Sequence, residues 1–270
     1  MQRTEARSIR RLGLALSGAL AVLGCEGLTT VLIPPADEVQ LGYELGDELR
    51  GELRFHPDPG VQAYLTELGE TILAAVPDMP SEYEFRFFVV DDDSMVNAFA
   101  VPGGGVYVYT GLILAAQTEA EVAGVIGHEI AHVIERHGAK RMITAWGVEE
   151  VLALLLGNNA PRLASLLSEL AATGALLKYS RDNELESDSE GLEWVMDAGY
   201  SPDGLIRFFE TMEALSGPTL PAFLSTHPNP GNRVDRLRDL LNGRADLPTW
   251  EGDQNAFETW QADIIGASPP

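Results

Sequence analysis

The longest regular run of apolar positions lies between residues 119 and 137. Apolar side chains surround nearly the whole circumference of a helix over this stretch, which favours a buried helix over a surface one. Thr118 followed by Glu121 has the spacing of a capping box, and Gly138 suits the position just past a helix end. The sequence therefore predicts a buried helix over about 119–137 that contains Val122, Ala123, Val125, Ile126, Ile130, Ala131, Val133 and Ile134.

Shorter patterns predict two earlier helices and a small sheet. Helical periodicity covers residues 37–53 and 58–76, and three short runs rich in β-formers follow. Pro102 and three glycines separate the last two runs, which is typical of a hairpin. Most of the remaining chain is helical in pattern. We expect an α+β fold, mostly helical with a three-stranded sheet, with strands over 85–90, 98–101 and 106–109.

A further helix is predicted after Ser180, a suitable N-cap, and ends before Gly199. Between the two long helices lies the apolar stretch 151–156, which is too short to span a membrane. It has two interpretations, core packing or a mobile flap over the site. Residues 246–270 are expected to form a C-terminal tail without recognisable chemistry.

The N-terminus resembles an export signal. Four arginines precede an apolar run over 12–23, long enough for the hydrophobic part of a signal peptide. The run ends in Val-Leu-Gly-Cys25, which resembles the lipobox of bacterial lipoproteins; a membrane anchor or an ordinary cleaved signal are the alternatives. We expect a signal peptide over 1–24, lipid on Cys25, and a tether over 25–36. The implied location is the periplasmic face of a bacterial membrane, and Glu26 favours the outer one.

Charge and cysteine content exclude several classes. The net charge is −23, and removal of residues 1–24 leaves 14 basic and 40 acidic residues, a net charge of −26. Nucleic acid is therefore not an expected partner, and an anionic membrane surface would repel the body of the protein. Cys25 is the only cysteine, so intrachain disulfides are excluded. Residues 37–245 are sufficient for one well-buried domain.

The buried helix carries His128-Glu129-Ile-Ala-His132. Residues on a helix advance by about 100° each, so the two histidines lie about 40° apart and both reach one cation. Glu129 points away from that cation and is placed to take a proton from the water that a zinc ion polarises. The alternative is a surface helix with two solvated histidines. The apolar neighbours argue against it, because a buried imidazole without a partner is costly.

A catalytic zinc ion usually takes three protein ligands and leaves one position for water. Glu184, on the helix predicted after Ser180, is our candidate for the third. Asp188 lies four residues later on the same face, where a carboxylate can accept the free N–H of a ligand histidine. The alternative is that these acidic residues form a solvated face. The residues alone leave both interpretations open.

Together, His-Glu-x-x-His and Asn183-Glu184-x-x-x-Asp188 resemble the gluzincin metallopeptidases, and more narrowly the CAAX prenyl-protease and HtpX-like family. Segments 97–111, 134–137 and 227–233 also match that family's pattern, in the same order. The chain has neither the several transmembrane helices nor the repeat domain of many relatives, so the small lipoprotein branch is favoured. The resemblance implies zinc held by His128, His132 and Glu184, with Glu129 as general base, Asp188 behind a ligand histidine, and His227 and Arg233 facing the cleft.

His227 begins His-Pro-Asn-Pro-Gly, which also fits a plain turn. Two functional roles remain open for it: a hydrogen bond to the oxyanion of the intermediate, to which Arg233 would add its charge, or a fourth metal ligand that keeps the enzyme latent, as in some relatives. His56 and His137 are assigned to structure. On a continuous helix His137 would lie about 140° from His132 and near the C-terminus, where a cation suits the macrodipole.

The glycine run Gly103-Gly104-Gly105 has a structural and a functional interpretation. It is a flexible hairpin turn, and with Val106 it also suits a sheet edge where an extended substrate adds a strand through main-chain hydrogen bonds. The expected function is a zinc endopeptidase that cleaves unfolded or misassembled envelope proteins. The alternative is a lipid-anchored chaperone or assembly factor whose metal site is structural or closed. Glu129 favours the enzyme, because a structural zinc site needs no base.

Overall fold

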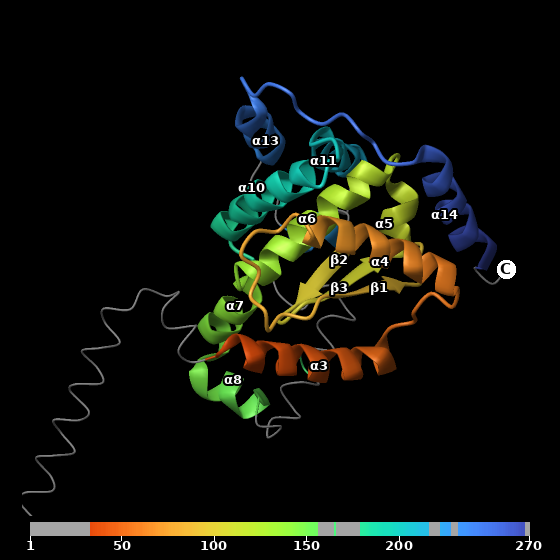
Figure 1. The fold of residues 1–270 in the computed structure, drawn as a ribbon. Coiled ribbons are helices and arrows are strands. Elements are labelled where there is room, and N and C mark those ends of the chain that lie inside the picture. The colour runs from red at the N-terminus through yellow and green to blue at the C-terminus, as the bar shows by residue number, and fades with distance from the viewer. Residues whose placement is uncertain (1–32, 156–164, 166–178, 216–221, 228–231, 268–270) are drawn as a thin grey trace, which may run out of the picture.

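The computed structural model describes residues 33–155, 165, 179–215, 222–227 and 232–267. Figure 1 shows a three-stranded sheet covered by helices on both faces. In chain order the elements are α3 (Pro35–Glu52), α4 (Pro59–Leu73), β1 (Arg86–Val90), β2 (Ala98–Val101), β3 (Gly105–Tyr109), α5 (Thr110–Ala115), α6 (Glu119–Ile134), α7 (His137–Trp146), α8 (Val148–Leu155), α10 (Arg181–Asp197), α11 (Asp203–Leu215), α12 (Ala222–Thr226), α13 (Arg233–Leu241) and α14 (Gln254–Ala267).

The sheet has the order β1-β3-β2. Strand β3 pairs in parallel with β1 and antiparallel with β2, so β2 and β3 form the predicted hairpin. Each of the three predicted strands is confirmed to within one residue. The predicted α+β class is confirmed as well, with the sheet as the smaller part of a mostly helical domain.

The alternation of side chains along the strands explains why helices lie on both faces. Val106 and Val108 of β3 belong to the core cluster that also contains buried residues of α4 and α6. Tyr107 and Tyr109, which point the other way, belong to the cluster that contains the buried leucines of α3. The sheet is therefore a middle layer between α3 on one side and α4 with α6 on the other (Figure 1).

Helix α6 is buried and begins at Glu119 as predicted, but its capping and its end differ from expectation. The hydroxyl of Thr118 donates to Glu251 rather than capping the helix, and Glu121 accepts from the backbone N–H of Gln117. The helix ends at Ile134 rather than near 137. Arg136 adopts a left-handed conformation, φ 58° and ψ 30°, and a new helix, α7, begins at the next residue. A break that no glycine marks is not visible in the sequence pattern.

Helix α10 begins and ends where the sequence predicts. The Ser180 hydroxyl accepts from the Asn183 backbone N–H, and the Asn183 side chain completes a capping box. Gly199 follows the helix with φ +93°. Helices α6 and α10 meet at Gly127 and Gly191, where a Cβ on Gly191 would lie 2.7 Å from the backbone nitrogen of His128. The two helices that carry the predicted ligands therefore pack backbone to backbone.

The segment predicted to be a C-terminal tail is instead part of the core. Phe257, Trp260 and Ile264 of α14 are almost completely buried in the larger cluster. Trp260 stacks on Tyr64 with ring centroids 4.4 Å apart and donates a hydrogen bond to the Val61 carbonyl of α4. These apolar residues have the i, i+3, i+7 spacing of one helix face, but the pattern is short and its neighbours are polar, so the segment was predicted to be a tail.

Part of the apolar stretch 151–156 is described, in helix α8. Val151 and Leu154 are buried against α3 in the smaller cluster, which supports the core-packing interpretation for these residues. Residue 156, the last of that stretch, lies outside the described residues.

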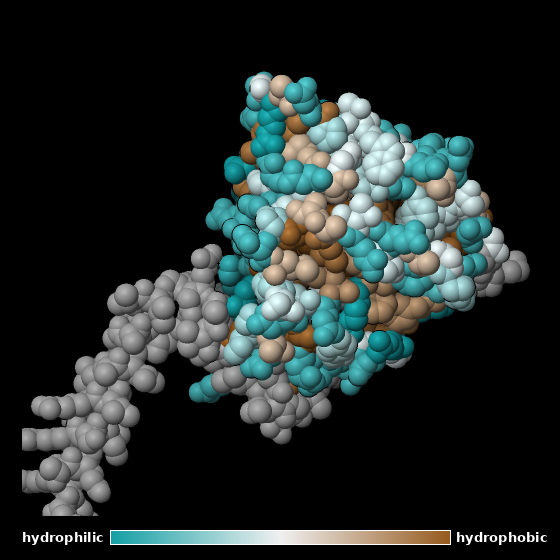
Figure 2. All heavy atoms as spheres, in the orientation of Figure 1, coloured by the Kyte–Doolittle hydropathy of each residue, from teal (hydrophilic) through white to brown (hydrophobic). Residues whose placement is uncertain are grey.

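The predicted signal peptide, Cys25 and most of the tether also lie outside the described residues. Among the helices that the structure does describe, none combines the length and apolar character needed to cross a membrane. Figure 2 shows a largely hydrophilic surface, with apolar side chains gathered near the middle of this face, where α4 and α6 meet in Figure 1.

Candidate metal centre

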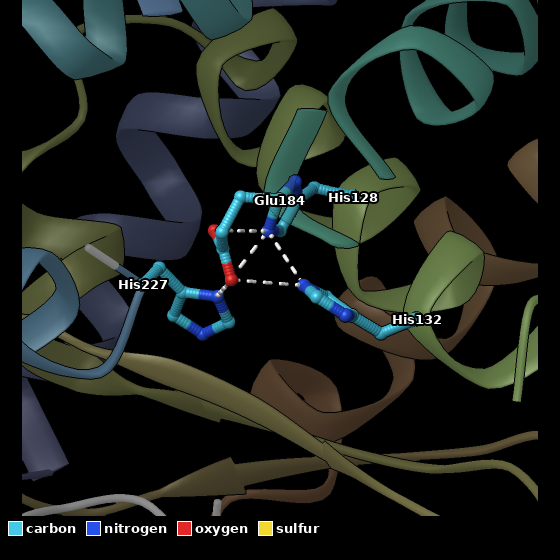
Figure 3. A group of neighbouring side chains, drawn as sticks. All are labelled: His128, His132, Glu184 and His227. Carbon is cyan, nitrogen blue, oxygen red and sulfur yellow. Dashed lines mark hydrogen bonds and ion pairs between the residues drawn. The ribbon is translucent and has the colours of Figure 1, made fainter. Parts of the chain in front are cut away.

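Four buried side chains from three parts of the chain converge on one point. His128 and His132 come from α6, Glu184 from the first turn of α10, and His227 from the residue after α12. Figure 3 shows them pointing toward one another. One donor atom from each lies within 4.8 Å of all the others. The predicted convergence of two helices on one site is thus present in the structure.

The distances identify the facing atoms. The Nε2 atoms of His128 and His132 are 3.0 Å apart, and each lies 3.5 Å from a different oxygen of Glu184. These atoms bear lone pairs in a region that excludes water, so they need a shared positive centre to offset their repulsion. Two imidazoles and a carboxylate are the donor set of catalytic zinc sites. The residues present therefore fit the ion.

The electrostatic field at the site also favours a cation. Burial lowers the pKa of His128, but its hydrogen bonds to Asp188 and Glu184 outweigh burial and raise that pKa to about 9. The same negative charge that favours a proton on His128 favours a metal cation in its place. When bound, zinc lowers the pKa of the water it takes and polarises a substrate carbonyl.

Glu129 lies in the site but outside the set of converging donors, as predicted. Its side chain is completely buried, and neither of its oxygens accepts a hydrogen bond from any described residue. The Nε2 atom of His227 lies 3.3 Å from one oxygen, at an angle unsuitable for a hydrogen bond. Burial raises the pKa of Glu129, which makes the carboxylate a better proton acceptor at neutral pH.

Asp188 holds one ligand histidine from behind, as the resemblance implies. Its Oδ1 atom lies 3.0 Å from Nδ1 of His128, the nitrogen that faces away from the converging atoms. Arg233 donates to both Asp188 oxygens, at 2.7 and 2.6 Å. Burial raises the pKa of Asp188, but the Arg233 ion pair outweighs it and the net shift is downward. An ionised Asp188 fixes the His128 proton on Nδ1 and leaves Nε2 free to bind metal.

The predicted role of Arg233 in stabilising an oxyanion needs correction. The residue is 1% exposed, and its guanidinium lies among protein groups. Besides the two bonds to Asp188, its Nη1 atom lies 3.1 Å from a Glu184 oxygen and donates to the His227 carbonyl. The buried guanidinium is therefore directed at protein groups, not at a cleft. Arg233 instead ties α13 to the two carboxylates of α10.

His227 lies against both parts of the site. Its Nδ1 atom is 3.3 Å from His128 Nε2 and 3.3 Å from a Glu184 oxygen, so it faces the predicted metal position. Its ring stacks on Phe223, and its backbone N–H donates to the Phe223 carbonyl, 2.8 Å away. Of the two roles predicted for it, this position corresponds to the fourth ligand. The four residues after it lie outside the described part of the chain.

Two residues at the site were not predicted. Tyr179 stacks on the His132 ring with centroids 3.9 Å apart, and His137 has its Nδ1 atom 3.0 Å from Nδ1 of His132. The assignment of His137 to structure assumed a continuous helix, and the turn at Arg136 brings it back to the site instead. Nothing in the sequence pattern marked that turn. His56, by contrast, accepts a backbone hydrogen bond from Asp58 and is not in the cluster.

The glycine run is explained by packing. A Cβ on Gly103 would lie 2.5 Å from the Glu38 carbonyl oxygen, and one on Gly104 would lie 2.7 Å from that of Glu84. Val106 is in the central strand and pairs on both sides, so it offers no free edge to a substrate. The prediction that Val106 binds substrate through its backbone is therefore wrong. Strand β2 is the edge strand on the side of α6.

A helix bearing His-Glu-x-x-His and a glutamate from a second helix, joined to a small sheet, define the gluzincin class of zinc metallopeptidases. The chain belongs to peptidase family M48, whose family model matches residues 59–241. The family resemblance read from the motifs is confirmed. The family is zinc-dependent, which agrees with the donor set at the site.

Three relatives illustrate the match. The chain is 29% identical to the beta-barrel assembly-enhancing protease of Escherichia coli, over 76% of this chain and 44% of that protein. It is 32% identical to the metalloprotease YcaL of E. coli, over 58% and 61%, and 36% identical to the mitochondrial metalloendopeptidase OMA1 of Arabidopsis thaliana, over 57% and 31%. The chain spans less than half the length of the beta-barrel assembly-enhancing proteases it matches.

Proposed function

We propose that this protein is a zinc endopeptidase in which His128, His132 and Glu184 hold the ion and Glu129 is the general base. The observation that carries the proposal is the pairing of two features in one buried site. Three ligand atoms converge, and beside them stands a carboxylate to which no described residue donates a hydrogen bond. A purely structural zinc site has no use for that carboxylate.

Each residue of the site has a separate role in the proposed reaction. Glu129 accepts a proton from the attacking water and returns it to the leaving amine, and its buried surroundings favour the neutral form in between. Asp188 keeps His128 in the tautomer that binds metal, and Arg233 keeps Asp188 ionised and in place. An extended substrate pairs with the edge strand β2, which runs beside α6.

The substrates we propose are unfolded or misassembled proteins of the bacterial envelope. Main-chain pairing with a strand tolerates many sequences, as a quality-control protease requires. The names of the E. coli and Yersinia pestis relatives refer to β-barrel assembly. We propose that lipid on Cys25 holds the protein on the periplasmic face, at the outer membrane in preference to the inner.

The deciding experiment compares wild type with Glu129→Gln on an unfolded β-rich protein, with metal content measured in parallel. Wild type should carry about one zinc per chain and cleave the substrate. The variant should keep its zinc and lose on the order of a hundredfold or more in cleavage rate, since general-base catalysis is worth that much. Full cleavage by the variant with zinc bound would remove Glu129 from catalysis.

The alternative is a lipid-anchored chaperone or assembly factor with a closed metal site. The position of His227 favours it, because a fourth donor facing the metal position leaves no place for water. A chaperone would suppress aggregation of the same β-rich protein equally well as wild type and as Glu129→Gln. A protease would protect the substrate only by removing it, and the variant would then fail.

A further inference from the structure

No described residue places a carboxylate behind His132. His128 is held at Nδ1 by Asp188, but the corresponding nitrogen of His132 faces another imidazole, that of His137, at 3.0 Å. His137 in turn places its Nε2 atom 3.0 Å from a carboxylate oxygen of Glu186. The buried ligand is thus linked through a second histidine to a carboxylate whose side chain is 45% exposed.

The direction of these hydrogen bonds follows from metal binding. If Nε2 of His132 binds the ion, its proton must be on Nδ1, so His132 donates and His137 accepts. His137 must then carry its own proton on Nε2, which faces Glu186 and is donated to it. Each bond has one donor and one acceptor, and the chain ends on an anion. The Ser187 hydroxyl, 3.2 Å from Nδ1 of His137, is the weaker competitor for the same lone pair.

The chain turns sharply just after α6, and this turn places His137 against His132. Arg136 adopts a left-handed backbone conformation there, which residues other than glycine, asparagine and aspartate rarely adopt. The Arg136 guanidinium donates to Glu38 at 2.8 and 2.6 Å, and Glu38 also accepts from Tyr83. A partly buried ion pair between α3 and the end of α6 therefore holds the turn that brings His137 back to His132.

We propose that His137 is a positioning residue for the metal ligand His132, and that it acts as a hydrogen-bond acceptor coupled to Glu186. The inference rests on the proposed zinc site and adds a residue to it. His128 and His132 are then oriented in different ways, one by a buried ion pair and the other through a histidine that reaches a partly exposed carboxylate.

The test is zinc affinity, measured on the full chain by competition with a chromophoric chelator. His137→Leu removes the acceptor and should weaken zinc binding about 10- to 100-fold, the usual effect of losing an outer partner of a ligand histidine. His137→Asn returns an acceptor oxygen near the position of Nδ1 and should recover a large part of that loss. An Asn variant as weak as the Leu variant would contradict the acceptor role.

The substitution of Glu186 has a matched control at Glu190, on the same helix. Glu186→Gln removes the terminal charge and should weaken zinc binding by less than His137→Leu does. Glu190→Gln makes the same charge change four residues further along α10, at an exposed side chain outside the donor cluster, and should leave zinc affinity at the wild-type value. Equal losses of zinc affinity in Glu186→Gln and Glu190→Gln would mean that only the overall negative charge of α10 affects the metal. That result would contradict the coupling of His137 to Glu186.

A spectroscopic readout needs no variant. Long-range proton–nitrogen NMR of the zinc-loaded wild type should show His137 as the Nε2–H tautomer, and an Nδ1–H tautomer would overturn the proposal. Thermal unfolding in excess chelator should show the Asn and Leu variants folded and equally stable without metal. A wild type that binds no zinc would remove the proposed function and this inference together. Wild-type zinc affinity and cleavage in His137→Leu would remove only this inference.

Discussion

His227 lies between Glu129 and the converging metal ligands, with one ring nitrogen facing each. A zinc ion held by His128, His132 and Glu184 would have one of its usual four positions left for water, and a ligand atom of His227 lies within 4.8 Å of theirs. Water and substrate need that same position. If His227 fills that position, it has to move before the site can act, and it is carried by the five-residue helix α12 rather than by α6 or α10.

His227→Ala should increase proteolysis for this reason. If the imidazole fills the fourth position in about nine-tenths of molecules, its removal raises the cleavage rate about tenfold. The measurement is the initial rate on an unfolded β-rich substrate at equal zinc occupancy. A loss of activity would instead support the oxyanion role, and an unchanged rate would place His227 outside the reaction.

His128 and His132 were predictable because helical spacing brings them to one cation. Helical spacing places Glu184 and Asp188 on one face of a capped helix, but only the family resemblance favoured a role at the site over a solvated face. His137 was not predictable, since its position depends on a left-handed residue stabilised by Glu38, almost a hundred residues earlier in the chain. Local patterns predict contacts within an element, and long-range ion pairs decide the contacts between elements.

At the scale of elements, the site depends on how closely α6 and α10 approach. The crossing point is Gly127 against Gly191, directly beside His128 and one turn from Asp188. A methyl group at Gly191 would lie 2.7 Å from backbone atoms of α6, which cannot move aside as a flexible side chain can. Any side chain here separates the helix that carries Glu184 from the helix that carries the histidines.

Gly191→Ala should therefore weaken zinc binding and lower the free energy of unfolding by about 1–3 kcal/mol, the usual effect of overpacking. The matched control is Gly51→Ala in α3, where a new Cβ would have no atom within 4 Å. That variant should be about 0.5–1 kcal/mol more stable, because alanine favours a helix, and should bind zinc normally. Chelator competition and urea unfolding measure both quantities. Normal zinc affinity in Gly191→Ala would show that the helices can separate without loss of the site.

Helix α14 packs against α4 and α5 and stabilises the domain there. Trp260→Ala removes a side chain that is 2% exposed, together with its stack on Tyr64 and its bond to the Val61 carbonyl. We expect a loss of about 3–5 kcal/mol in the free energy of unfolding. Ile265→Ala on the same helix changes a side chain that is 63% exposed and should stay within about 0.5 kcal/mol of wild type. Urea unfolding distinguishes the two, and equal small effects would restore the interpretation of this segment as a tail.

It was easier to predict which helices and strands exist than to predict where they end or which elements they pack against. The strands were visible because three short runs of β-formers are separated by turn residues, and α10 was visible because Ser180 and Gly199 mark its limits. Helix α14 was missed because its packing partner, α4, lies nearly two hundred residues earlier. An amphipathic pattern that weak becomes meaningful only when the surface it covers is known.

For the molecule as a whole, the net charge of −23 and the buried tyrosines determine how stability responds to pH. Most of the acidic charge is spread over the surface, where solvent screens it. The tyrosines are different, because burial raises the pKa of six of them above the ordinary value, for Tyr107 and Tyr109 to about 12. The others, shifted further in the same direction, are Tyr64, Tyr83, Tyr179 and Tyr200.

A raised pKa means that the folded protein keeps these protons after the unfolded chain has released them. Above about pH 10 the folded state binds more protons, so the free energy of unfolding falls as pH rises, by at most about 1.4 kcal/mol per pH unit for each tyrosine. Six such groups can offset the whole stability of a domain of this size within one to two pH units. We therefore expect cooperative unfolding between about pH 10 and 12, in which tyrosinate absorbance and the loss of helical circular dichroism rise together. Tyrosinate that appears near pH 10 in a protein still fully helical would show that these hydroxyls are accessible to solvent in the folded state.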